Sequence, residues 1–147
     1  LASKSRDNSR TPMQWDASQH AGFTEGEPWI NLCDNAAEIN VAAALSDADS
    51  VFYTYQKLIA LRKVEPVITW GDYQDLLPDS PHLWCYQREW QGQRLLVIAN
   101  LSDTFQNWQP VQADGNWQVL MHNYAEVASQ PGDMTLRPFE AVWWLQK

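Results

Sequence analysis

Residues 95–99 read Leu-Leu-Val-Ile-Ala, a continuous apolar run between polar neighbours. A strand that is hydrophobic at every position must be covered on both faces, because successive side chains point to opposite sides of a sheet. Gln91-Gly92-Gln93 precedes the run and reads as a tight hairpin turn from the segment 83–89. The run therefore predicts a central strand in a sheet that other elements cover on both sides.

The chain from residue 65 onward carries further strand patterns. Its short segments are rich in β-branched or aromatic residues and are separated by Pro, Gly and Asp turn signals. The expected strands are residues 67–73, 83–89, 94–100, 104–109, 117–122 and 134–146. Short strands at this spacing favour an antiparallel β-sandwich.

Residues 50–64 carry the clearest helical pattern. Asp49 or Ser50 can cap its N-terminus, and Pro66 stops it. Apolar side chains recur at helical spacing and form a stripe: Phe52, Tyr55, Leu58 and Ile59. The residues before the helix offer little to cover this stripe, so we expect its packing partner to lie in a part of a longer chain.

Residues 1–50 read mostly as loop, because Pro and Gly interrupt every periodic pattern. A short helix is expected at residues 38–45, where alanines cluster. Loops of such length inside a compact domain are usually functional or disordered. The first residue is Leu1, and no helix or strand pattern begins there, so we expect a piece of a larger protein.

The charge balance restricts the partners. The formal net charge is -8, from 18 acidic and 10 basic residues. This balance argues against a nucleic-acid backbone or an anionic membrane as partner, and its simplest role is solubility. Cys33 and Cys85 form no metal-ligand spacing, so neither a metal nor a cofactor is expected. No apolar run is long enough to cross a bilayer, and a cytoplasmic protein with reduced thiols is the expectation.

The sequence presents no local catalytic motif. His20, His82 and His122 are not spaced as a metal-binding pair, and structural or surface roles suit them better than proton transfer. The acidic residues form no recognisable catalytic pair, and no serine stands in a nucleophile elbow. No residue of the chain is therefore assigned as catalytic.

Nine tryptophans are many for 147 residues. Their flat rings can fill a core or a domain interface, and they can also stack on sugar faces. Trp143 and Trp144 are neighbours in an expected strand and must point to opposite faces, so one of them is partly exposed or covered by another element.

The densest polar segment spans residues 5–15 and reads SRDNSRTPMQW. Its Arg, Asp and Asn side chains can hold an extended loop through bonds to the backbone. They can also bind sugar hydroxyls, a task that suits the planar five-donor guanidinium. Spacing alone favours the first interpretation, a loop anchored by an Arg–Asp pair.

This segment resembles a block found in bacterial α-glucosidases of the α-amylase clan. The resemblance covers SRDNSRTPMQWD at 5–16, AGFT at 21–24 and PWI at 28–30. It continues through EINV at 38–41 and DSVFYTYQKLIALRK at 49–63 to LRPFEA at 136–141, and so runs over nearly the whole chain. The family includes oligo-1,6-glucosidases, dextran glucosidases and trehalose-6-phosphate hydrolases. The Ser9-Arg10 pair and the many tryptophans resemble the last group most.

The resemblance implies a mainly β fold: a C-terminal antiparallel β-sandwich preceded by the last loop and helix of a (β/α)8 barrel. Residues 1–64 would be the C-terminal end of the catalytic barrel, and residues 65–147 the sandwich. Loops at the carboxyl ends of barrel strands carry the active site, so the block 5–16 would lie on the catalytic face.

The resemblance also implies roles for single residues. Arg10 matches the family's arginine that holds the non-reducing glucose, and Arg6 and Asp7 are weaker substrate-binding candidates beside it. The family's three catalytic carboxylates precede this block, so the chain alone is expected to be inactive. The implied parent is a retaining glycosidase that acts on a small sugar substrate, trehalose 6-phosphate, and yields glucose and glucose 6-phosphate.

Three alternatives remain beside this interpretation. The parent could be an oligo-1,6-glucosidase of the same family. The sandwich could be an independent sugar-binding module that uses exposed tryptophans, or a structural domain that only supports the barrel, and we favour the structural role for the sandwich itself.

Overall fold

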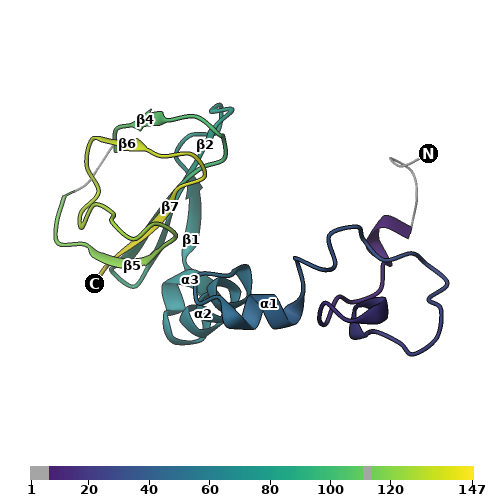
Figure 1. The fold of residues 1–147 in the computed structure, drawn as a ribbon. Coiled ribbons are helices and arrows are strands. Elements are labelled where there is room, and N and C mark those ends of the chain that lie inside the picture. Colours follow the sequence, from purple (N-terminus) through teal and green to yellow (C-terminus); the bar gives the residue numbers. More distant parts are fainter. Residues whose placement is uncertain (1–6, 111–113) are drawn as a thin grey trace. The chain divides into compact units, whose positions relative to one another are not determined.

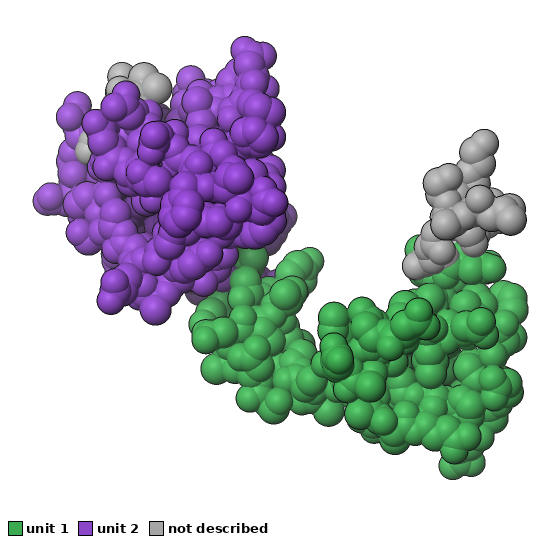
Figure 2. All heavy atoms as spheres, turned by 45° about the horizontal axis from the view of Figure 1, so that its top comes forward, with its two compact units in different colours: residues 1–58 green, residues 59–147 purple. Residues whose placement is uncertain are grey.

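The computed structural model describes residues 7–110 and 114–147 (Figure 1). The chain divides into two compact units, Leu1–Leu58 and Ile59–Lys147, coloured separately in Figure 2. This division falls inside the expected helix 50–64, whereas the family resemblance puts the domain boundary after residue 64. The domain boundary therefore stays a prediction. In the described part of the chain, no helix combines the length and apolar character needed to span a bilayer.

The first unit is mainly loop with short helical turns. The turns are η2 (Asp7–Ser9) and η3 (Gln19–Gly22), and a six-residue helix α1 (Val41–Ser46) follows. The sequence places this helix at 38–45, three residues too early at its N-terminus. The reason is Asn40, whose side-chain oxygen accepts a hydrogen bond from the backbone N–H of Ala43 at 2.9 Å and caps the helix.

Helix α2 (Val51–Val64) confirms the helix expected at 50–64. The hydroxyl of Ser50, one of the two expected capping residues, donates to the Ala44 carbonyl at 2.7 Å. No residue of α2 is fully buried, and several apolar side chains lie exposed: Val51, Phe52, Tyr55, Ile59 and Val64. The expected apolar stripe thus has no covering element over these positions within the described residues.

The strand expected at residues 67–73 is wrong. Helix α3 (Pro66–Trp70) occupies most of this segment, and strand β1 (Asp72–Asp75) begins only after it. Pro66 stands in the first helical turn, where its missing N–H costs nothing and its fixed φ suits a helix. Val67 and Ile68 are buried against Leu95, Val97 and Leu145, and this tertiary burial outweighs their β-branched preference for strands.

Strands β2 (Leu83–Trp90) and β3 (Gln93–Asn100) form the expected hairpin. Gln91 and Gly92 connect them with φ of 49° and 82°, the left-handed pair of a two-residue hairpin turn. The five-stranded antiparallel sheet has the order β1-β2-β3-β7-β5 and is completed by β7 (Ala141–Gln146) and β5 (Gln118–His122). β3 is therefore the central strand, as the apolar run predicts.

Both faces of β3 are covered. Leu96 and Ile98 belong to one buried cluster, which also contains Trp108, Trp117, Leu136 and Trp144. Leu95 and Val97 belong to the other, under α3. Trp144 is fully buried in the first cluster, while its neighbour Trp143 is partly buried against the second. The opposite placement of these two rings is thus confirmed.

A two-stranded sheet of β4 (Gln106–Trp108) and β6 (Met134–Leu136) packs over the first cluster and makes the fold a sandwich. The mainly β fold with an antiparallel sandwich is therefore confirmed. The single strand expected at 134–146 is instead two strands, β6 and β7, in different sheets. A turn at residues 137–140 separates them, where Pro138 is followed by Phe139 at a φ of 55°.

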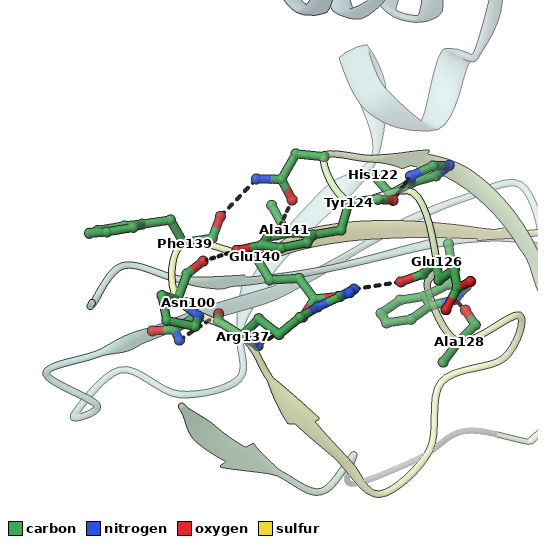
Figure 3. A network of polar contacts seen from close by, with 12 residues as sticks. Asn100, His122, Tyr124, Glu126, Ala128, Arg137, Phe139, Glu140 and Ala141 are labelled. Atoms are coloured by element: carbon green, nitrogen blue, oxygen red, sulfur yellow. Dashed lines mark hydrogen bonds and ion pairs between the residues drawn. The ribbon is translucent and has the colours of Figure 1, made fainter. Parts of the chain in front are cut away.

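A polar network holds this turn (Figure 3). The buried carboxylate of Glu140 accepts hydrogen bonds from the backbone N–H of Arg137 at 2.8 Å and from its guanidinium at 2.7 and 3.0 Å. The buried amide of Asn100 donates to the carbonyls of Thr104 and Arg137, so it ties the end of β3 to the same turn. The network fixes the crossing of the chain from the small sheet to the large one.

Candidate functional site

The expected substrate-binding residues lie at the start of the first unit. Asp7 and Arg10 are exposed, and the backbone N–H of Arg10 donates to the carbonyl of Asp7 at 3.0 Å, which places both in one turn. The predicted candidate Arg6 lies outside the described residues. The structure therefore brings two of the three candidates together through the backbone of η2.

The Arg10 guanidinium carbon lies 6.0 Å from the ring centroid of Trp29. At this distance a guanidinium over a tryptophan face gains a weak cation–π attraction. Trp29 is 83% exposed, so its ring presents a wide apolar face beside a fixed positive charge. Sequence reasoning did not pair these residues, because a separation of 19 positions in a loop carries no periodic signal.

A tight turn follows at residues 15–22. The backbone N–H groups of Trp15 and Asp16 both donate to the carbonyl of Ala21, at 2.8 and 3.3 Å. The Asp16 carboxylate accepts hydrogen bonds from the hydroxyl and the backbone N–H of Ser18, and these bonds lower the pKa of Asp16. The turn is closed by His20, Ala21 and Gly22, all at positive φ. These local bonds brace the turn that follows the polar block.

The turn is tied to the following helix. The first N–H groups of α1, on Val41 and Ala42, donate to the carbonyls of Gln14 and Trp15, each at 2.9 Å. The Gln14 amide donates in turn to the carbonyl of Ile39. The helix terminus and the block 5–16 therefore satisfy each other's backbone groups, which positions the loop by direct contacts within this unit.

The groups available here are a hydrogen-bond-donating guanidinium and apolar ring faces. A guanidinium offers several donors in a plane, and exposed rings such as Trp15 and Trp29 offer apolar faces. His20 lies 3.9 Å from the carboxylate of Glu27, too far for a hydrogen bond. Among the described residues, no group of three or more potential ligands could hold a metal ion.

Comparisons with known proteins give this site its context. Residues 1–71 match the family model described as the catalytic domain of alpha amylase. All 147 residues align at 71% identity with a trehalose-6-phosphate hydrolase of Escherichia coli strain K12. The chain belongs to the α-amylase family.

Other members of the α-amylase family are similar over the same range. An oligo-1,6-glucosidase of Heyndrickxia coagulans is 49% identical over 98% of this chain. The crystal structure of a trehalose-6-phosphate hydrolase of Bacillus licheniformis superposes with a TM-score of 0.92, at 42% identity over 98% of this chain. The chain spans about a quarter of these relatives: 27% of the Escherichia coli protein, 25% of the Heyndrickxia protein and 27% of the crystallised one.

The α-amylase catalytic-domain match ends at Gly71, directly after α3 and before β1. The match thus covers Asp7, Arg10, Trp29 and the three α-helices, and the sandwich strands follow it. The first unit therefore carries catalytic-domain sequence, and this is where the resemblance places the substrate-binding arginine.

Proposed function

We propose that the chain is the C-terminal part of a retaining α-glucosidase that hydrolyses trehalose 6-phosphate to glucose and glucose 6-phosphate. The observation that carries the proposal is the 71% identity over the whole chain to a trehalose-6-phosphate hydrolase. The identity to an oligo-1,6-glucosidase is 49% over nearly the same residues. Two cysteines without a disulfide, Cys33 exposed and Cys85 buried, suit the reducing cytoplasm, where we place the protein.

In this proposal Arg10 holds the non-reducing glucose through its hydroxyls, and Asp7 and Arg6 support it. The exposed position of Arg10, in a turn closed on Asp7, supports a role in contacting a ligand. A retaining glycosidase needs two carboxyl groups about 5–5.5 Å apart, one as nucleophile and one as acid and base. We expect these carboxylates in the catalytic domain outside this chain, so the 147 residues alone should not turn over substrate.

The test uses the parent enzyme that contains these residues. Arg10→Ala should lower kcat/KM for trehalose 6-phosphate by about 100-fold, the usual effect of losing one donor that acts in the transition state. Arg62→Ala removes an equally exposed arginine from α2 and serves as the matched control. Kinetics of Arg10→Ala that equal those of the control would reject the binding role of Arg10.

The second candidate is an oligo-1,6-glucosidase, which the 49% identical relative favours. The two candidates share the α-glucosyl group and differ in the group that leaves. We expect a higher kcat/KM for trehalose 6-phosphate than for isomaltose. The reverse order would assign the parent to the second candidate, whatever the result for Arg10→Ala.

A further inference from the structure

The outer face of the five-stranded sheet, which points away from β4 and β6, is covered at one end. Helix α3 packs on that end, where Leu95, Val97 and Leu145 form a buried cluster with Val67 and Ile68 of the helix. The burial of this face therefore depends on a helix that precedes the first strand of the sandwich.

The burial does not continue along the same strands. Ala99 follows Val97 on this face of β3, and in the register it pairs with Trp84 of β2 and Ala141 of β7. Ala99 and Ala141 are only partly buried, and Trp84 is 47% exposed. Within the described residues, this end of the face is open.

The covered end is held by Arg88 of β2. Its guanidinium donates to the carbonyl of Ile68 at 2.7 Å and to that of Gly71 at 2.7 and 3.0 Å, so a cation satisfies two carbonyls at the C-terminus of α3. An added Cβ at Gly71 would lie 2.5 Å from the Val67 carbonyl oxygen and 3.0 Å from the Arg88 Cβ, so the helix end and β2 meet too closely for a larger residue. Gly71 is also the last residue of the catalytic-domain match. The sandwich thus already binds catalytic-domain sequence on this face.

Three aromatic side chains stand at the open end. The ring centroid of Tyr86 lies 5.3 Å from that of Tyr73 and 5.1 Å from that of Trp84, and the ring planes in these pairs are inclined by 33° and 42°. The Trp84 indole N–H donates to the Tyr73 hydroxyl at 3.4 Å. Tyr73 is 53% exposed, about as much as Trp84. Because the polar atoms of these two rings face each other, the surface that they present to solvent is mainly apolar.

This arrangement suits a protein surface better than a sugar. The inclined rings offer no flat platform for a pyranose, and the Trp84 N–H and the Tyr73 hydroxyl already bond each other. Trp and Tyr are among the residues that most often anchor protein–protein contacts. The occupant is indicated by the relatives, because the chain spans 27% of the Escherichia coli protein and most of that relative lies outside the alignment.

We propose that the open end of this face, around Trp84 and Tyr73, is a docking surface for the part of the catalytic domain that lies outside these 147 residues. The contact extends the one that α3 makes on the same face of the sheet. It buries the two exposed rings, and the small side chains of Ala99 and Ala141 leave room beside Trp84 for a side chain of the docked domain. The inference rests on the proposed function only in that the chain is part of a longer enzyme, and not on its substrate.

The test is hydroxyl-radical footprinting of the parent enzyme and of the 147-residue chain, with oxidation measured at each residue by mass spectrometry. Trp84 should be oxidised about fivefold more slowly in the parent, because a half-exposed ring becomes part of an interface core. Tyr73 should slow down likewise. Phe105 is 65% exposed and precedes β4 in the other sheet, so it is the internal control and should react equally in both proteins. The readout needs no turnover, so a parent that does not cleave trehalose 6-phosphate would still test the docking surface.

A charge in the docking surface should open it. In the parent, Trp84→Asp should raise the oxidation of Tyr73 to the rate that the same variant shows in the 147-residue chain, because charged residues are depleted at interface cores. Phe105→Asp places the same charge outside the face and is the matched control. It should leave Tyr73 protected in the parent.

Three results would overturn the proposal. The first is equal oxidation of Trp84 in the parent and in the 147-residue chain, relative to Phe105. The second is protection of Trp84 in the 147-residue chain that grows with protein concentration, which would assign the face to a second copy. The third is protection in the parent only when maltose is added, which would assign the face to a sugar. If the 147-residue chain alone does not fold, the parent decides: Trp84 oxidised faster than Phe105 there would equally refute docking, since an indole reacts faster than a phenyl ring at equal exposure.

Discussion

Glu140 is a carboxylate with almost no solvent contact at the turn between the two sheets, and its replacement by glutamine changes little but charge. In Glu140→Gln the side-chain carbonyl can still accept the bond from the Arg137 backbone N–H. The new NH₂ group, however, replaces the second oxygen, so a hydrogen-bond donor faces the guanidinium where it previously had an acceptor. We expect the variant to fold and to lose stability in the second unit.

The magnitude follows from the bond that is lost. The Arg137 Nη2 bond to Oε1 at 2.7 Å is lost, and a hydrogen bond to a charged group contributes about 1.5–3 kcal/mol. The Nε bond at 3.0 Å shares Oε2 with the backbone N–H and is kept, but its acceptor is no longer charged. A neutral amide is less costly to bury than a carboxylate, which offsets part of the loss. Because Arg137 is one-third exposed and one charged hydrogen bond is lost, we expect Glu140→Gln to lower the free energy of unfolding by about 2 kcal/mol.

The effect should depend on pH. The hydrogen bonds from Arg137 hold the pKa of Glu140 below its ordinary value of 4.5, against the opposing effect of burial. A carboxyl group with a lowered pKa binds its proton more readily when unfolded, so it stabilises the fold above the unfolded pKa. This stabilisation is lost as the pH falls through the folded pKa. The stability difference between wild type and variant should thus be full at neutral pH and shrink in acid.

The assay is urea unfolding of both proteins at a series of pH values, followed by near-ultraviolet circular dichroism of the sandwich tryptophans. Glu126→Gln is the matched control, because Glu126 is exposed and the hydrogen bond that it accepts from Arg137 goes to its backbone carbonyl, which the substitution leaves in place. That control should stay within about 0.5 kcal/mol of wild type. A cost for Glu140→Gln below about 1 kcal/mol, or one that is the same at neutral and acid pH, would refute the reasoning.

Two further predictions concern single residues. Burial raises the pKa of Cys85 to about 12, so at mildly alkaline pH a thiol reagent should modify only the exposed Cys33 in the native chain. Cys33→Ser should then abolish the native reaction. Modification of native Cys85 at the rate of Cys33 would contradict this. Gly22 has a φ of 66°, and an added Cβ would lie 2.9 Å from the Asp16 carboxylate, so Gly22→Ala should cost about 1–2 kcal/mol locally. Amide exchange at Trp15 should then speed up about tenfold, while Gly26→Ala, whose nearest atom would be 4.0 Å away, should leave it unchanged.

The central part of the sandwich was predictable because its determinants are local. Three local patterns predict it without reference to distant residues. The continuous apolar run predicts the central strand, the Gln-Gly turn predicts the hairpin, and the alternation at Trp143 and Trp144 predicts which face of the sheet each ring lies on. Residues 66–70 were not predictable in this way. Val67 and Ile68 favour strands in isolation, and only their contact with the finished sheet makes a helix the better solution.

The sites show the same limit. The sequence singled out Arg10 through a resemblance in one block, but its neighbour Trp29 lies in a loop whose path no pattern reveals. The contact of Tyr73 with Tyr86 depends on the register of β1, a strand whose start was misplaced. Such contacts appear only once the long-range pairing of the chain is known.

The strand order also bears on synthesis by the ribosome. β7 comprises the last strand residues of the chain, 141–146, yet it lies between β3 and β5 and pairs with both. During translation, β2 and β3 can form their hairpin as soon as they emerge, but β5 has no partner in the large sheet until β7 leaves the exit tunnel. Until β7 is available, the apolar strand β3 has no pairing strand at one edge, and such an exposed edge is prone to aggregation. Completion of the large sheet therefore depends on β7, the last of its five strands to be synthesised.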